Sequence, residues 1–215
     1  MRVSRPPVSA QAAELLLPPS DLHRIHRLRR EEDRSRSRLA LVIVRMAIGA
    51  WRGVSPDLLH IERSPSGKPS IAGSPAFSIT HADDCVAVAF VATGHIGVDV
   101  EPVRDDLDLD SIAERCWHVS EYDTWRRVSP EKRPAWFARH WTAKESIVKA
   151  LGLGVDSMAV IACDSWTTTG SKHRVLELGG YGDPSSWSLL LAADGDFRMA
   201  VATDQRSHDI EIIAL

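Results

Sequence analysis

The chain has 215 residues, of which 44% are hydrophobic and 26% charged, and its formal net charge is −3. This is ordinary globular composition, and it excludes intrinsic disorder, collagen and a long coiled coil. The longest apolar run, residues 39–50, is interrupted by Arg45, so no transmembrane helix is expected, and the N-terminus shows no secretory signal. Three cysteines without a CxxC spacing give no basis for a disulfide framework or a structural zinc site. We therefore expect a cytoplasmic protein with reduced thiols.

The N-terminal part is predicted to be helical. Residues 1–20 contain two Pro-Pro pairs and are expected to form a lightly ordered leader. Ser20-Asp21 predicts the cap of a short helix that ends near residue 30. A longer helix follows, capped by Asp33 or Ser35 and ended by Gly53. Helical spacing predicts that its core-facing side carries Leu39, Ile43, Met46, Ala47 and Ala50.

The spacing of apolar residues then changes from that of a helix to that of strands. After a loop rich in glycine and proline over residues 64–75, strands are predicted over residues 77–81, 85–93 and 96–100. Gly94-His95 forms the turn between the last two strands. Two or three adjacent strands joined by a tight turn indicate an antiparallel meander.

The same order of elements follows in the rest of the chain. Helices are predicted over residues 112–115, 120–127 and 135–151, and strands over residues 174–178, 187–192 and 197–202, the last two joined by Asp194-Gly195. The predicted fold class is therefore α+β. Two similar α+β halves, residues 21–105 and 106–215, each an antiparallel meander plus helices, are expected to pack as a pseudo-dimer within one chain, after the leader of residues 1–20.

The charges are unevenly distributed along the chain. Residues 22–45 contain eight arginines and three acidic residues, a local charge of +5, whereas residues 99–123 have a local charge of −7. A basic arm and an acidic centre suit an anionic ligand that is held partly by side chains and partly through a metal ion. On charge alone, two solvated faces are the favoured explanation of the pattern.

Two acidic residues on a predicted strand point to a metal. Asp99 and Glu101 lie on the same side of a strand that is otherwise made of valine and isoleucine. Burying both is unfavourable unless a cation compensates them, and hard oxygen ligands favour Mg²⁺ or Mn²⁺. The alternative is a strand end that emerges into solvent. Trp141, Glu145 and Lys149 share one face of the long predicted helix. Glu145 and Lys149 either form an ordinary ion pair there, or Glu145 is a third metal carboxylate beside the ammonium of Lys149.

Two further segments carry candidate phosphate ligands. Gly67-Lys68-Pro69 places a lysine in a loop between a flexible and a rigid residue. Residues 77–81 end a strand with the hydroxyl of Thr80 and the imidazole of His81. A histidine in this place contacts a phosphate or serves as an ordinary surface or core residue, and the sequence leaves both open.

Taken together, these segments resemble one family. Residues 67–69, 77–81, 97–101 and 141–145, followed by Lys149, have the order and approximate spacing of the Sfp-type 4′-phosphopantetheinyl transferases. The resemblance covers about residues 36–154, and the last third fits only in its strand pattern. The family usually has asparagine where this chain has Ser78 and serine where it has Thr80.

The resemblance implies a fold, an activity and a set of site residues. It implies a monomer that transfers 4′-phosphopantetheine from coenzyme A (CoA) to a serine hydroxyl of an acyl or peptidyl carrier protein, with Mg²⁺ or Mn²⁺ and without a nucleic-acid or membrane partner. By the family pattern, Asp99, Glu101 and Glu145 match the metal carboxylates. The catalytic residues are Glu145, which matches the proposed base for the serine with a metal-bound hydroxide as the alternative base, and Lys149, which matches the lysine beside the pyrophosphate. The residues that match CoA contacts are Arg24, Arg36, Lys68, Thr80, His81 and Lys149, with Arg36 expected to be the main residue of the basic arm.

Two other functions remain open on the residues alone. Two acids on a strand with a nearby glutamate and lysine also suit a metal-dependent nuclease or phosphodiesterase. A non-catalytic module that binds CoA or a carrier protein is the third candidate. Release of adenosine 3′,5′-bisphosphate in the presence of Mg²⁺ and a carrier protein would separate the three.

Overall fold

The computed structural model describes residues 15–165, 172–205 and 213–214. The helices are α2 (Pro19–His26), α3 (Glu31–Arg52), α4 (Leu109–Cys116), α5 (Val119–Trp125) and α6 (Arg133–Leu151), with the 3-10 turns η1 (Pro56–Leu58), η2 (Pro130–Lys132), η3 (Val155–Val160) and η4 (Pro184–Ser186). The strands are β1 (Glu62–Arg63), β2 (Pro69–Ser70), β3 (Ala76–Ala82), β4 (Cys85–Val91), β5 (Ile96–Pro102), β6 (Ile161–Cys163), β7 (Lys172–His173), β8 (Val175–Leu178), β9 (Ser188–Asp194), β10 (Phe197–Thr203) and β11 (Ile213–Ala214). Within the described ranges, no helix has the length and apolar character needed to cross a membrane.

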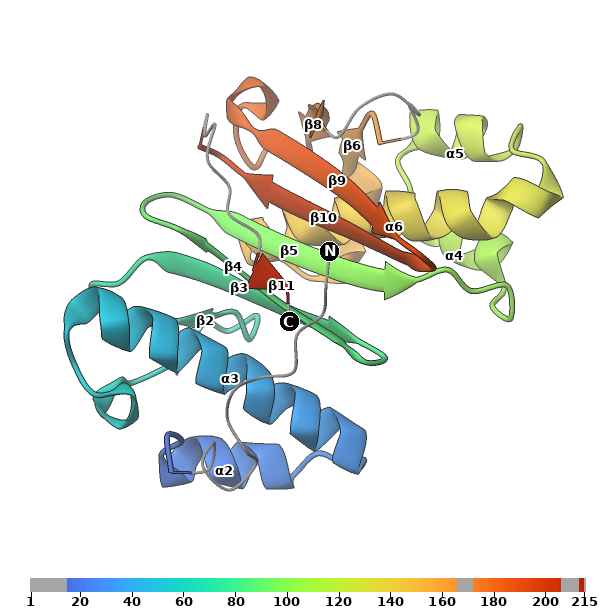
Figure 1. The fold of residues 1–215 in the computed structure, drawn as a ribbon. Helices are drawn as coiled ribbons and strands as arrows, with labels where there is room; N and C mark the ends of the chain where they lie inside the picture. Colours follow the sequence, from blue (N-terminus) through green and yellow to red (C-terminus); the bar gives the residue numbers. More distant parts are fainter. Residues whose placement is uncertain (1–14, 166–171, 206–212, 215) are drawn as a thin grey trace.

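Two main sheets lie side by side (Figure 1). One has the strand order β11-β4-β3 and the other β5-β10-β9-β7, and all their paired strands are antiparallel. Helix α3 packs against the first sheet, and α6 packs against β5 and β10 of the second. The predicted α+β class is confirmed. The division into two similar halves stays a prediction.

Strand β5 pairs differently from the sequence prediction. β3 and β4 form the expected hairpin, but β5 pairs along its length with β10, so that Asp99 lies opposite Ala200. The backbone N–H and the ring Nδ1 of His95 each lie 2.7 Å from a carboxylate oxygen of Asp204, just after β10. The meander predicted for two or three strands therefore forms with two, β3 and β4, and the strand expected as its third member pairs with β10 instead. Strand β5 instead joins elements from both predicted halves.

The N-terminal helix begins and packs differently from the prediction. α2 begins at Pro19 and has no side-chain cap. The predicted cap residue Asp21 is buried, and its Oδ2 accepts hydrogen bonds from Nε and Nη2 of Arg45 at 2.9 and 2.6 Å. Leu17 belongs to the predicted leader but is only 4% exposed, packing in the same cluster as Ile25. Residues 1–14 of the leader lie outside the described residues.

The buried face of α3 is rotated from the predicted one. The helix begins at Glu31, before either predicted cap, and ends as predicted at a left-handed Gly53 with φ of 66°. Met46 and Ala50 were predicted to face the core but are exposed. The buried residues are Ala40, Leu41, Val42, Val44, Arg45, Ile48 and Gly49. Because α2 and the first sheet both pack on α3, the buried surface follows two partners rather than one apolar stripe.

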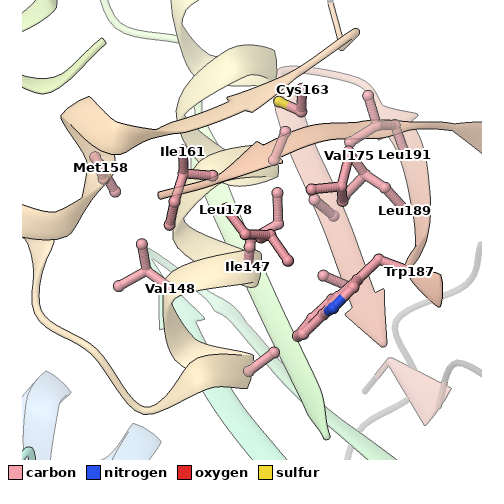
Figure 2. Close-up of a cluster of buried hydrophobic side chains, with 14 residues drawn as sticks. Ile147, Val148, Met158, Ile161, Cys163, Val175, Leu178, Trp187, Leu189 and Leu191 are labelled. Carbon is pink, nitrogen blue, oxygen red and sulfur yellow. The ribbon is translucent and has the colours of Figure 1, made fainter. Parts of the chain in front are cut away.

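The C-terminal elements agree well with the prediction. The predicted β9–β10 hairpin forms, and its loop is Gly195-Asp196, with φ of 54° at Gly195. Figure 2 shows the largest core cluster, in which Ile147 and Val148 of α6 pack among apolar side chains from η3, β6, β8, β9 and Trp187. This packing holds α6 against the sheet that contains β9, β10 and β5.

Helix α6 and strand β5 approach each other closely at Gly97. A Cβ atom at this position would lie 1.9 Å from the backbone oxygen of Ser146 and 2.5 Å from the backbone nitrogen of Ala150. Only glycine permits this approach. The contact brings Glu145 and Lys149 of the helix next to Asp99 on the strand.

Candidate active site

A cavity of about 490 Å³ lies where α2, α3, the β1–β2 hairpin, β3, β5 and the end of α6 meet. Eight of the nine predicted site residues line it: Arg24, Lys68, Thr80, His81, Asp99, Glu101, Glu145 and Lys149. The structure therefore brings together, in one cavity, residues from five separate elements that the residue spacing and the family resemblance had singled out. The exception is Arg36.

Asp99 lies at the centre of the polar contacts in this cavity. Its side chain is almost fully buried, and its Oδ1 accepts a hydrogen bond from Thr80 Oγ1 at 3.0 Å and another from Lys149 Nζ at 2.7 Å. Lys149 Nζ also lies 3.3 Å from Thr80 Oγ1. Burial raises the pKa of Asp99 above its usual value, and the nearby ammonium of Lys149 opposes that shift.

Glu101 and Glu145 share the electrostatic environment of Asp99. Burial, and then the negative charge of Asp99, raise the pKa of Glu101 to about 7, with a smaller contribution from Glu145. Burial also raises the pKa of Glu145, where Lys149 acts in the opposite direction and Asp99 adds to the shift. The negative charge of Asp99 therefore raises the pKa of both glutamates, as expected for carboxylates that line one cavity.

Two carboxylate oxygens in the cavity are buried without a hydrogen-bond partner within the described part of the chain. They are Asp99 Oδ2 on β5 and Glu145 Oε2 on α6. A buried carboxylate oxygen is unfavourable unless it is hydrogen-bonded or binds a cation. An all-oxygen donor set is the kind that Mg²⁺ and Mn²⁺ prefer. The residues present therefore fit a hard divalent cation.

A second group of potential ligands lies elsewhere and does not suit this metal. Among the described residues, ligand atoms of Glu121, His140 and Cys163 lie within 4.8 Å of one another, and all three side chains are buried. The carboxylate of Glu121 already accepts a hydrogen bond from the buried ammonium of Lys144, which also donates to the carbonyl of Ile161 at 2.6 Å. A second cation there would face that ammonium. The group is a buried polar network that joins α5, α6 and β6.

The comparisons with known proteins identify the family. A profile described as "4′-phosphopantetheinyl transferase superfamily" matches residues 95–202, just over half of the 215-residue chain. The chain belongs to this superfamily. The match contains β5 and α6, which carry the three acids and Lys149. The predicted family is confirmed, and with it an enzyme of phosphopantetheinyl transfer; a nuclease has no support from these comparisons.

Named relatives extend the similarity over most of the chain. It is 29% identical to the 4′-phosphopantetheinyl transferase HetI of Nostoc sp. over 93% of this chain and 84% of the relative. It is 27% identical to the putative 4′-phosphopantetheinyl transferase slr0495 of Synechocystis sp., over 88% and 80%. Among solved structures, the holo-[acyl-carrier-protein] synthase of Thermotoga maritima is 23% identical, with a TM-score of 0.41, over 52% of this chain and 64% of that one.

The arginines of the cavity differ from those that the family pattern predicted. Arg36 is not among the lining residues, because its guanidinium binds the Asp33 carboxylate at 2.5 Å and the Asp83 carbonyl at 2.6 Å. Arg63 was not predicted, but it lines the cavity together with Arg24. Burial, and then the neighbouring charge of Arg24, lower the pKa of Arg63. The one feature of the sequence that could have pointed to Arg63 as a cavity residue is its position five residues before Lys68.

Ser78, which replaces the usual asparagine, has a role in the fold. Its hydroxyl is buried and accepts a hydrogen bond from the backbone N–H of Val98 at 3.1 Å. Two residues later, Thr80 donates to Asp99. These two hydroxyls on one face of β3 therefore connect the two sheets beside the acids, so that Ser78 helps to hold β5 in place.

Proposed function

We propose that this protein transfers the 4′-phosphopantetheine group from CoA to a serine hydroxyl of an acyl or peptidyl carrier protein. The observation that carries the proposal is one cavity lined by Asp99, Glu101, Glu145 and Lys149 together with arginines from α2 and β1. Acids for a metal and cations for phosphates in one cavity suit a substrate with a pyrophosphate and a 3′-phosphate. The predicted monomeric state, cytoplasmic location and lack of nucleic-acid or membrane partners stay predictions.

Asp99, Glu101 and Glu145 would hold Mg²⁺ or Mn²⁺. When bound, the ion supplies positive charge to the pyrophosphate oxygens. The support from this chain is the pair of unpartnered buried oxygens on Asp99 and Glu145. Of the two carboxylate oxygens of Asp99, Lys149 contacts only Oδ1, which leaves Oδ2 available for the ion.

The chain's own residues position the reactants and move one proton. The serine oxygen forms a bond to the β-phosphorus of CoA while the bond between that phosphorus and the bridging oxygen breaks, releasing adenosine 3′,5′-bisphosphate. Glu145 takes the hydroxyl proton, and its raised pKa makes it a better acceptor than an ordinary carboxylate. Lys149 stabilises negative charge on the leaving phosphate. No covalent enzyme intermediate is needed, so the cysteines are structural.

A direct assay tests the proposed function. The protein is incubated with CoA, Mg²⁺ and a panel of apo carrier proteins, and the masses of the carriers and the release of adenosine 3′,5′-bisphosphate are measured. We expect one carrier to gain a phosphopantetheine group, and we expect EDTA to abolish the gain. A CoA-binding protein that modifies no carrier in the panel and releases no bisphosphate would favour the non-catalytic module instead.

We expect Lys149→Met to reduce kcat on the order of 10²–10³-fold, as for the loss of one preorganised charge-stabilising group. Negative charge on the leaving phosphate develops only as the bond breaks, so the ammonium stabilises the transition state more than bound CoA. The Kd for CoA should change only modestly. The check is steady-state kinetics together with CoA titration. A kcat within about threefold of wild type would mean that Lys149 merely pairs with Asp99.

We expect Arg63→Ala to raise the KM for CoA roughly 10–100-fold, the range for loss of one charge-assisted hydrogen bond. Arg36→Ala should raise it less, because the Arg36 guanidinium is already bound to Asp33 and Asp83. The two variants are compared with CoA and with dephospho-CoA. A larger effect of Arg36→Ala would restore the family-based assignment of this arginine as the main residue of the arm.

We expect CoA to bind less tightly as the pH rises above about 8. Burial lowers the pKa of Lys68 to about 8, and only its protonated form attracts a phosphate. Bound phosphate favours the charged form, so the affinity is lost as that pKa is exceeded in the free protein. CoA titrations between pH 7 and 9.5 measure this. In Lys68→Arg, the affinity for CoA should depend less steeply on pH, since arginine stays protonated throughout this range.

A further inference from the structure

Lys68 is presented to the cavity by a tightly bonded turn between β1 and β2. The backbone N–H of Ser64 donates to the Lys68 carbonyl at 3.0 Å, and the N–H of Lys68 donates to Ser64 Oγ at 3.1 Å. Gly67 provides the left-handed residue of this turn, with φ of 87°. The side chain of Lys68 therefore starts from a fixed backbone position.

The ammonium of Lys68 joins the two elements that carry the proposed metal ligands. Its Nζ lies 2.5 Å from the carbonyl oxygen of Ala150, in the last turn of α6, and 3.3 Å from that of Ile96, the first residue of β5. The last carbonyls of a helix lack partners within the helix and carry partial negative charge, so a cation is favourable there.

We propose that Lys68 is a positioning residue that holds the C-terminal end of α6 against the start of β5, and thereby sets the spacing between Glu145 and Lys149 on the helix and Asp99 on the strand. Two of the three ammonium N–H groups bind the carbonyls, and the third is free for a phosphate of CoA. The consequence for catalysis rests on the proposed function, whereas the consequence for structure does not.

This role differs in its consequences from a simple phosphate contact. Losing a phosphate contact weakens CoA binding and leaves the free protein unchanged. Losing the link between α6 and β5 loosens both elements when no ligand is present. Small displacements of reacting groups cost on the order of 10²-fold in rate, so kcat should also fall at saturating CoA.

Amide hydrogen exchange of the ligand-free protein tests the proposal. In Lys68→Met, we expect the amides of Gly152 and Leu153, which close the end of α6, to exchange about 10–100 times faster than in wild type. The amide of Val98 on β5 should respond in the same direction. The β9–β10 hairpin, which Lys68 does not contact, should keep its exchange rates. Lys132→Met, which removes an exposed lysine, is the matched control.

Two further measurements separate this role from general destabilisation and from a phosphate contact. Lys68→Arg keeps the charge and the donors, and it should restore most of the slow exchange. For Lys68→Met we expect kcat to fall about tenfold or more at saturating CoA. Unchanged exchange at Gly152 with only a raised KM would overturn the proposal and leave the transferase function intact. Faster amide exchange spread evenly over the chain of Lys68→Met would also overturn the proposal.

Discussion

The Asp99→Asn variant is expected to lose on the order of 10³-fold or more in kcat/KM, the scale seen when a central member of a catalytic group is removed. Asparagine keeps the shape of the side chain and still accepts a hydrogen bond from Thr80. It removes the negative charge that Lys149 contacts and one of the oxygen ligands proposed for the metal. The loss of kcat/KM therefore measures the effect of removing the charge of Asp99 rather than a change in packing.

The same variant is expected to keep or gain stability when no metal is bound. The raised pKa of Asp99 means that the folded protein binds a proton more readily than the unfolded chain does. The folded state is therefore penalised as the pH rises through the unfolded and then the folded pKa, and at neutral pH removal of the charge relieves this penalty. Lys149 is left without its partner, but its side chain is 30% exposed and can be hydrated.

Urea unfolding in EDTA and steady-state kinetics check both parts of this expectation. Asp106→Asn, which removes an exposed carboxylate from the loop after β5, is the control and should leave both quantities near wild type. A strongly destabilised Asp99→Asn protein would show that the Asp99–Lys149 pair holds the fold together. In that case the lost activity would say nothing about a metal.

The main part of the site was predictable because it depends on local periodicity. Alternation along a strand places Asp99 and Glu101 on one side, and helical spacing places Glu145 and Lys149 on one face, whatever surrounds them. The family resemblance added that the two elements meet. The structure places their side chains in one cavity.

The parts that were missed depend on contacts between distant residues. Strand β5 pairs along its length with β10, so each of its partners lies about a hundred positions later in the chain. The buried face of α3 was missed because Arg45, which reads as a surface residue, is buried through its ion pair with Asp21. No local pattern specifies such a partner.

The Gly97→Ala variant is expected to lose both stability and activity, although it adds a single methyl group. The new Cβ would lie 1.9 Å from the backbone oxygen of Ser146, whereas carbon atoms in contact sit roughly 3.5–4 Å from their neighbours. Both nearby atoms belong to the backbone of α6, so no side chain can rotate out of the way. The helix must move away from β5 by more than 1 Å, on the order of the gap between those distances.

Overpacking of this kind costs about 1–3 kcal/mol, and the backbone clash places Gly97→Ala at the upper end. A 1 Å displacement of Glu145 and Lys149 from Asp99 should lower kcat on the order of 10²-fold in the protein that stays folded. Gly154→Ala is the control, because no heavy atom lies within 4 Å of its added Cβ, and it should change stability by about 0.5 kcal/mol or less. Normal stability and activity in Gly97→Ala would mean that α6 does not rest on the backbone of β5, and the geometry proposed for the acids would then fail with it.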